Sequence, residues 1–478
     1  MNFRRKLWWA QHRTDVYKYG TILSLVLIVT ISIIYFTYSK FTSKNEMTAY
    51  ETTVQPFIKN DYFIASYING EWSDSIPGKN DGYIVDKIVC DNGATGTWDY
   101  SEWGINIRNA TKKIKCGVYF KPNVAKQIVE LVANDTTNFA TDDPDNNIRY
   151  IGKAPNNYIY FNCSDYSNQT DDTCEKWRII GVFKNVNKAD GTKEDLVKII
   201  RDDTIGLFAW DYKGTGVGTS TSTSGSNDWT DSQLMMMLNP TDYLKFGYTI
   251  ENGIVKDSNG QEIYQNMGSY YNGTSGCKPT SITSGSSFSC TSIDFTSTGL
   301  KNDLTRNAIE SVVWNLGGRT NMSASVETFY ADERSTTVYS NRPSSWIGKI
   351  GLMYPSDFGY APAGDRGTGK EVSRSDCLSL VLSSLSGEVL TCYGSDYLFK
   401  WENSAINPAM PLPLEYWTIT PYSSRSDHVY FLKSPANLNA SKSLDDTARV
   451  RPVIFLKSSL SISGGAGSET NPYQLKLQ

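Results

Sequence analysis

Histidine is scarce in this sequence: the 478 residues contain only His12 and His428. This count excludes a histidine-based metal cluster and any catalytic triad that does not use His428. Ser426 and Asp427 precede His428, but an extended chain turns Asp427 to the opposite face and leaves Ser426 about 6.6 Å along the strand. The chain also lacks a G-x-S-x-G nucleophile motif. We therefore expect no catalytic residues and predict that the protein is not an enzyme.

The sequence also has no excess of basic residues over acidic ones. Lys and Arg number 46 against 50 Asp and Glu, which gives a formal net charge of −4. Proteins that bind nucleic acids need a basic face to neutralise phosphates. The balance of charge therefore argues against a nucleic-acid partner.

Charged residues are absent from residues 19–39, an apolar stretch bounded by Lys18 and Lys40. About 20 apolar residues in a helix span the hydrocarbon core of a bilayer. Five basic residues lie within residues 1–18, and basic residues favour the cytoplasmic side. The sequence thus predicts an uncleaved single-pass helix in the cell membrane, with a cytoplasmic N-terminus and extracellular C-terminal domains. A cleaved signal peptide is the alternative, against which the length of the run argues.

Cysteine is absent from the first 89 residues, so all eight cysteines lie beyond the predicted membrane segment. An even number of cysteines on an oxidising side predicts disulfides, although eight allow 105 connectivities. Buried free thiols are the alternative. The favoured pairing joins close sequential couples: Cys90 with Cys116, Cys163 with Cys174, Cys277 with Cys290, and Cys377 with Cys392.

The order of patterns along the chain predicts six segments. Short runs of β-branched and aromatic residues separated by turn formers indicate strands, and apolar residues at helical spacing indicate helices at 122–134 and 304–318. The predicted segments are a cytoplasmic tail (1–18), the membrane helix (19–39), a stalk (40–54), a small β module (55–121), a connecting helix with an acidic loop (122–147), and a large domain (148–478) that ends in a β-hairpin.

The acidic loop offers the best candidate metal ligands. Asp142, Asp143, Asp145 and Asn146 could supply oxygens to Ca²⁺, a hard cation that prefers carboxylate and carbonyl ligands. Their spacing is not that of an EF-hand loop. The alternative is a turn fixed by Pro144, with no bound ion. We expect no other cofactor.

Several longer motifs resemble one family. They are DDPDNNIRYIGKAPNNYIYFN (142–162), WRIIGVF (177–183), NDWTDSQLMMMLN (227–239), WIGKIGLMYPSDFGYA (346–361) and VRPVIFLKSS (450–459). Together they are similar to a family of uncharacterised bacterial single-pass surface proteins. The resemblance implies a domain of the C-type-lectin and formylglycine-generating-enzyme superfold, in which WRIIGVF and RVRPVIFL neighbour each other in one sheet. The expected fold class is therefore α+β: a transmembrane helix, a small all-β module and a C-type-lectin-like mixed domain.

The motifs of the active branches of that superfold are missing. The chain has no Glu-Pro-Asn, Gln-Pro-Asp or Trp-Asn-Asp triplet for calcium and sugar, and Cys377 and Cys392 are too far apart for a catalytic thiol pair. Function in such folds resides in individual sites rather than in the fold.

Aromatic residues are abundant and could provide a surface for stacking on a ligand. We expect loops 214–226, 272–300, 318–345 and 360–375 to form a binding face. The hypothesis is an extracellular adhesion protein that binds a glycan or a protein. An extracellular enzyme of the formylglycine-generating or hydrolase type and a structural subunit of a surface assembly are the alternatives. The candidate binding residues are Trp314, Trp346, Tyr354, Tyr360, Trp401, Trp417 and Tyr422.

Overall fold

A computed structural model gives the structure of the chain, which divides into two compact units. The first comprises residues 1–63, 90–96 and 107–116, and the second comprises residues 64–89, 97–106 and 117–478. The described residues are 12–15, 17–30 and 62–477, with gaps at 111–112, 134, 136, 212–224, 240–248, 252–253, 257–261, 266–275, 280–289, 294–299, 365–371, 385–390, 394–395, 400–414 and 434–436.

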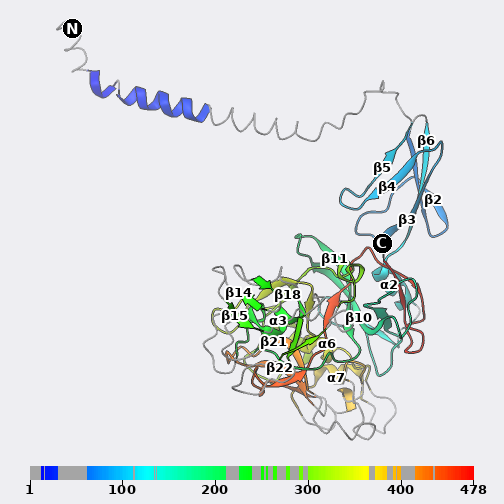
Figure 1. The fold of residues 1–478 in the computed structure, drawn as a ribbon, viewed down its shortest axis with the longest axis vertical. Coiled ribbons are helices and arrows are strands. Elements are labelled where there is room, and N and C mark those ends of the chain that lie inside the picture. The colour runs from blue at the N-terminus through cyan, green and yellow to red at the C-terminus, as the bar shows by residue number, and fades with distance from the viewer. Residues whose placement is uncertain are drawn as a thin grey trace. The chain divides into compact units, whose positions relative to one another are not determined.

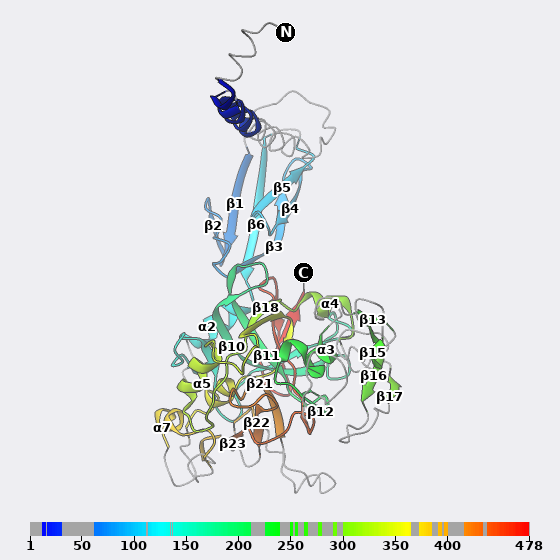
Figure 2. The same ribbon diagram turned by 90° about the vertical axis from the view of Figure 1, so that its left-hand side faces the viewer.

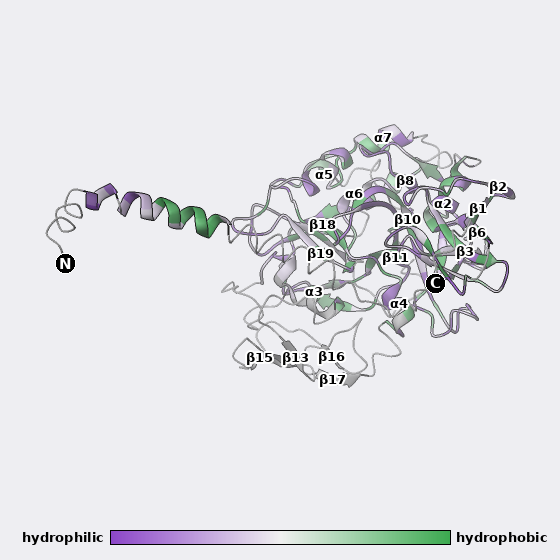
Figure 3. Ribbon diagram, turned by 90° about the horizontal axis from the view of Figure 1, so that it is seen from above, coloured by the Kyte–Doolittle hydropathy of each residue, from purple (hydrophilic) through white to green (hydrophobic). Residues whose placement is uncertain are grey.

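The N-terminal helix differs from the prediction. Helical residues are described at 12–15 and 17–30, and Figure 3 shows the hydrophobic character of the later turns. No helix in the described part of the chain is both long and apolar enough to cross a membrane. The prediction of a membrane helix over 19–39 is corrected accordingly. Residues 31–39 and the predicted stalk at 40–54 lie outside the described residues.

A four-stranded sheet with the order β2-β1-β6-β3, in which β1 and β2 are antiparallel, forms the small β module together with the paired strands β4 and β5. Within this module Trp98 contacts Trp103 and Phe120 edge to face, and the rings of Trp103 and Phe120 are tilted against each other. Figure 1 shows these strands in blue and cyan: β1 (Tyr62–Ile68), β2 (Glu71–Ser73), β3 (Tyr83–Cys90), β4 (Thr95–Asp99), β5 (Gly104–Arg108) and β6 (Ile114–Pro122).

A seven-stranded sheet organises the large domain, with the order β20-β25-β11-β10-β8-β7 and β9 paired to β10. Its two longest strands are rich in apolar residues and are buried along much of their length, as expected for strands covered on both faces. The strands are β7 (Phe139–Ala140), β8 (Ile148–Tyr150), β9 (Tyr158–Phe161), β10 (Glu175–Asn187), β11 (Lys193–Arg201), β20 (Ile350–Gly351) and β25 (Val453–Phe455).

A second sheet has the order β12-β24-β21-β22-β23 and contributes Trp417 and Phe431 to the same core. The strands of this sheet (Figure 2) are β12 (Leu207–Ala209), β21 (Glu415–Pro421), β22 (Val429–Lys433), β23 (Asn437–Asn439) and β24 (Thr447–Arg449). Paired outside both sheets are β13 (Thr249–Glu251), β14 (Ile254–Lys256), β15 (Glu262–Gln265), β16 (Gly276–Pro279), β17 (Cys290–Ile293), β18 (Val312–Asn315), β19 (Ser345–Gly348), β26 (Ser461–Gly464) and β27 (Gln474–Lys476).

The helices in the large domain are short. The predicted connecting helix is confirmed as α2, whose Asn123 side chain accepts a hydrogen bond from the Lys126 amide and so caps its N-terminus. The described helices after residue 61 are α2 (Val124–Val132), η1 (Trp229–Asp231), α3 (Gln233–Leu238), α4 (Asp303–Asn307), α5 (Val326–Glu333), α6 (Pro355–Gly359) and α7 (Arg374–Ser379).

Strand therefore predominates over helix in the described structure, and the predicted α+β class with a C-type-lectin-like mixed domain is wrong. The predicted helix at 304–318 shows why. Only α4 forms there, and Val312–Asn315 instead pairs with β19. In this strand buried residues (Val312 and Trp314) alternate with half-buried ones. The same apolar residues are also spaced as in a helix, so the sequence pattern suited either structure. In the sheet, β11 separates the strands of WRIIGVF and RVRPVIFL, which are not direct neighbours.

Three of the predicted disulfides are confirmed: Cys90–Cys116, Cys163–Cys174 and Cys377–Cys392. The residues of the fourth couple, Cys277 and Cys290, lie on the paired strands β16 and β17, but their side chains are outside the described structure. Each confirmed bridge closes a short loop, of 26, 11 and 15 residues respectively.

Gly181 lies on β10 opposite Arg149 of β8, where the two backbones leave no room for a side chain. A Cβ atom at this position would lie 2.2 Å from the carbonyl oxygen of Ile148. We expect Gly181→Ala to destabilise the protein by about 1–3 kcal/mol, because the clash is with backbone that cannot rotate away. Gly104→Ala is the control, since the nearest atom lies 4.0 Å away. Urea unfolding curves measure both, and equal stability of the two variants would contradict the prediction.

Candidate functional site

The predicted aromatic surface is not found. Five of its residues are buried in the hydrophobic core, and Tyr422 packs against that core while only partly buried. Trp401 lies outside the described residues. Their rings contact other core side chains, as Trp314 does with Phe455 and Trp417 with Phe431. The buried five are Trp314, Trp346, Tyr354, Tyr360 and Trp417.

The predicted calcium ligands point to different partners. Asp142 makes a two-pronged ion pair with Arg374, with both N–O distances 2.8 Å. Asp143 is buried and accepts from Arg149, while Asp145 accepts a hydrogen bond from the Tyr330 hydroxyl. Asn146 has a positive φ of 52°, which marks the turn. Among the described residues no group of three or more His, Cys, Asp or Glu side chains converges on a metal position.

His428 has a closer partner than predicted. Its Nδ1 atom lies 2.8 Å from Asp427 Oδ1, because the residues form a turn and an isolated bridge rather than a regular strand. Asp427 also pairs with Arg425. Partial burial acts to raise the pKa of Asp427, but its hydrogen bonds with Arg425 and His428 hold that pKa below the usual value. The contacts of Asp427 with Arg425 and His428 therefore stabilise the turn before β22.

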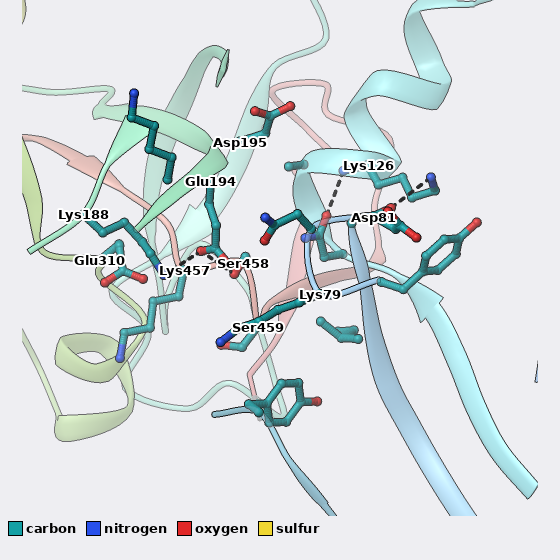
Figure 4. A pocket seen from close by; sticks show the side chains of 18 of the residues that line it. Lys79, Asp81, Lys126, Lys188, Glu194, Asp195, Glu310, Lys457, Ser458 and Ser459 are labelled. Atoms are coloured by element: carbon teal, nitrogen blue, oxygen red, sulfur yellow. Dashed lines mark hydrogen bonds and ion pairs between the residues drawn. The ribbon is translucent and has the colours of Figure 1, made fainter. Parts of the chain in front are cut away.

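A cavity of about 850 Å³ lies within the second compact unit. Its walls come from the loop before β3, the β4–β5 turn, the start of α2, the β10–β11 hairpin and the loop after β25. Figure 4 shows the charged side chains that face it. Tyr83, Tyr100 and Trp103 add aromatic surface, and Asn80 and Asn185 add amides. The cavity thus combines charge, hydrogen-bonding groups and rings.

Lysine is the prevailing charged side chain in this cavity, with six lysines against five carboxylates. Lys188 is paired with Glu194 at 3.0 Å. Lys79 and Lys126 donate to backbone carbonyls, and Lys126 also lies over the Tyr83 ring. Within the described residues Lys184, Lys193 and Lys457 have no carboxylate at ion-pair distance.

The carboxylates of the cavity are engaged locally instead. Asp81 accepts from the Gly78 amide, Asp195 accepts from the Asn185 amide, and Glu194 accepts from Lys188 and from the Ser458 hydroxyl. Burial raises the pKa of Glu310, against the opposing effect of Lys188. With six lysines against five carboxylates, the lining of the cavity has a small excess of basic residues.

A buried chain of charges is the second polar feature, and it lies in the core of the large domain. Arg149 Nε is 2.6 Å from Asp143 Oδ2, and Arg149 Nη1 is 3.3 Å from Asp357 Oδ1. Asp357 Oδ2 accepts directly from Lys198 Nζ and, at 3.0 Å, from the Tyr354 amide. All four charged side chains are at most 2% exposed. Two cations and two anions alternate, so the chain is neutral as a whole.

Burial changes the protonation of this cluster. It lowers the pKa of Lys198 to about 8, although Asp357 opposes the shift. Burial also raises the pKa of Glu333 to about 7, and the carboxyl group of Glu333 accepts from the amide and the hydroxyl of Ser356. Burial alone would raise the pKa of Asp357, but Lys198 and Arg149 hold it below the usual value.

Neither polar feature was among the predicted sites. The cavity assembles lysines from distant segments, which no local pattern reveals. A signal for the buried cluster did exist: Lys198 stands between Val197 and Ile199 in a strand with apolar residues on both faces. No protein-family model, no curated protein sequence and no solved structure matches the chain.

Proposed function

We propose that this protein is an extracellular recognition protein that binds an acidic glycan in the lysine-lined cavity. The observation that carries the proposal is the set of three lysines, Lys184, Lys193 and Lys457, with no carboxylate at ion-pair distance among the described residues. Ammonium groups without a carboxylate partner attract an anion that enters the cavity. The disulfides fit an oxidising compartment outside the cell.

The other lining residues suit a sugar rather than a bare ion. Asn80 and Asn185 offer both donors and acceptors to hydroxyl groups, and Tyr83 and Trp103 offer ring surface to the apolar face of a pyranose. A volume of about 850 Å³ is within the usual range for small-molecule sites. Charge, amides and rings together favour a carboxylated oligosaccharide over a neutral one.

The lysines are the test of this proposal. We expect the triple variant Lys184→Gln, Lys193→Gln, Lys457→Gln to bind hyaluronan oligosaccharides at least about 10-fold more weakly than the unmodified protein, since three favourable charge contacts are lost. Isothermal titration calorimetry at low ionic strength measures the affinity, and added salt should weaken binding further.

A control separates the cavity from general surface charge. The variant Lys115→Gln, Lys153→Gln removes two exposed lysines that do not line the cavity and should bind as the unmodified protein does. Equal loss in both variants would show non-specific attraction. No binding of hyaluronan, or equal binding of neutral dextran oligosaccharides, would overturn the proposal.

A further inference from the structure

The Lys198–Asp357 pair joins two distant parts of the large domain. Lys198 lies on β11 in the central sheet, and Asp357 lies on α6, 159 residues later. Rings surround the ammonium group: the centroids of Tyr354 and Phe183 are 4.5 and 5.0 Å from Nζ. Lys198 and Asp357 are each 1% exposed, so water is excluded from the contact.

We propose that Lys198 and Asp357 are a covalent modification site, at which their side chains join in an intramolecular amide bond. Nζ of Lys198 bonds to Cγ of Asp357, the bond from Cγ to Oδ2 breaks, and Oδ2 leaves as water. The two hydrogens of that water come from the ammonium group, which starts with three and keeps one. Atoms and charge balance without an oxidant or any other reactant.

Proximity and dryness make this reaction accessible. A nucleophile held against its electrophile gains an effective molarity of about 10⁵–10⁸ M in well-oriented cases. Exclusion of water removes the reactant that would hydrolyse the amide. Burial lowers the pKa of Lys198 to about 8, which makes its amine easier to expose as a nucleophile than that of an ordinary lysine. Because Lys198 and Arg149 hold the pKa of Asp357 below its usual value, the ion pair is the starting state of the reaction.

Arg149 is placed to assist the attack. Its Nη1 lies 3.3 Å from Oδ1 of Asp357, the oxygen that gains negative charge when Nζ adds to Cγ. After water leaves, Oδ1 becomes the amide oxygen and keeps this donor. The product is also balanced in charge, because Arg149 retains Asp143 at 2.6 Å while the lysine and aspartate charges disappear together.

Intact mass spectrometry of the full chain, after reduction and alkylation of its cysteines, tests the proposal. The unmodified protein should be lighter than its sequence by the mass of one water molecule. Its tryptic digest should contain one branched peptide that carries both Lys198 and Asp357. The variants Lys198→Met and Asp357→Ala should each have the full sequence mass.

Lys442 provides the matched control, because it forms an ion pair of 2.7 Å with Glu415 in a less buried position. Lys442→Met should keep the loss of one water. Full sequence mass of the unmodified protein after prolonged incubation, with the peptides of residues 198 and 357 recovered in linear form, would overturn the proposal. This result does not depend on whether any variant folds, and glycan binding has no part in it.

Discussion

Replacing Arg149 with methionine is expected to lower the free energy of unfolding by about 3–5 kcal/mol, the usual cost of removing one partner from a buried ion pair. Asp143 would lose the guanidinium group 2.6 Å away and would remain in a site without access to water. The hydrogen bonds from Asn147 to Asp143 would remain, but neutral donors compensate a buried carboxylate only in part.

Urea unfolding at neutral pH measures this effect. The double variant Arg149→Met, Asp143→Leu is the informative control, since it replaces both charges by apolar groups of similar size. We expect the double variant to recover a large part of the lost stability, because uncompensated charge rather than lost packing causes the defect. A single variant as stable as the unmodified protein would refute this account of the cluster.

Asp396→Asn is expected to change how stability depends on pH. Burial raises the pKa of Asp396 to about 7, above its ordinary value of 3.8, and Oδ2 has no hydrogen-bond partner. The folded state therefore holds its proton more tightly than the unfolded state does. The contribution of Asp396 to the free energy of unfolding is complete below about pH 4, decreases as the pH rises to about 7, and is absent at higher pH. At about 1.4 kcal/mol per pH unit, the total is about 4 kcal/mol.

The asparagine variant does not titrate, and its amide oxygen can still accept from the amides of Leu398 and Phe399, as Asp396 Oδ1 does. Compared with the unmodified protein, it should gain about 4 kcal/mol between pH 4 and pH 8. Urea unfolding at several pH values measures the difference. Asp446→Asn, at an exposed aspartate, should show no such gain. Parallel pH profiles of the unmodified protein and Asp396→Asn would contradict the prediction.

Local sequence patterns predicted part of the fold. Short runs rich in β-branched and aromatic residues located β10 and β11, and helical spacing located α2. Each of these signals depends on residues close together in the chain. The segment 304–318 failed because its apolar residues suit either a helix or a strand, and the choice was made by pairing with β19 some thirty residues later.

The sites were harder to predict for a related reason. Composition shows that aromatic residues are abundant, but it does not show whether a ring faces solvent or the core, and Trp314 and Trp417 proved to be core residues. Similarly, the carboxylates of 142–146 pointed to calcium until Arg149 and Arg374 were seen to occupy two of them. Charged partners distant in sequence determine what a carboxylate does.

The position of β25 has a consequence for the order in which the protein can assemble. Val453–Phe455 pairs with β11 on one side and β20 on the other, inside the central sheet. A ribosome delivers these residues long after it delivers β10 and β11. Until then the outer edge of β11 has unpaired amides and carbonyls, which invite pairing with other chains. Sequence-distant pairing of this kind also slows folding. A chaperone that shields the β11 edge during synthesis would therefore raise the yield of native protein more than a factor that accelerates local folding.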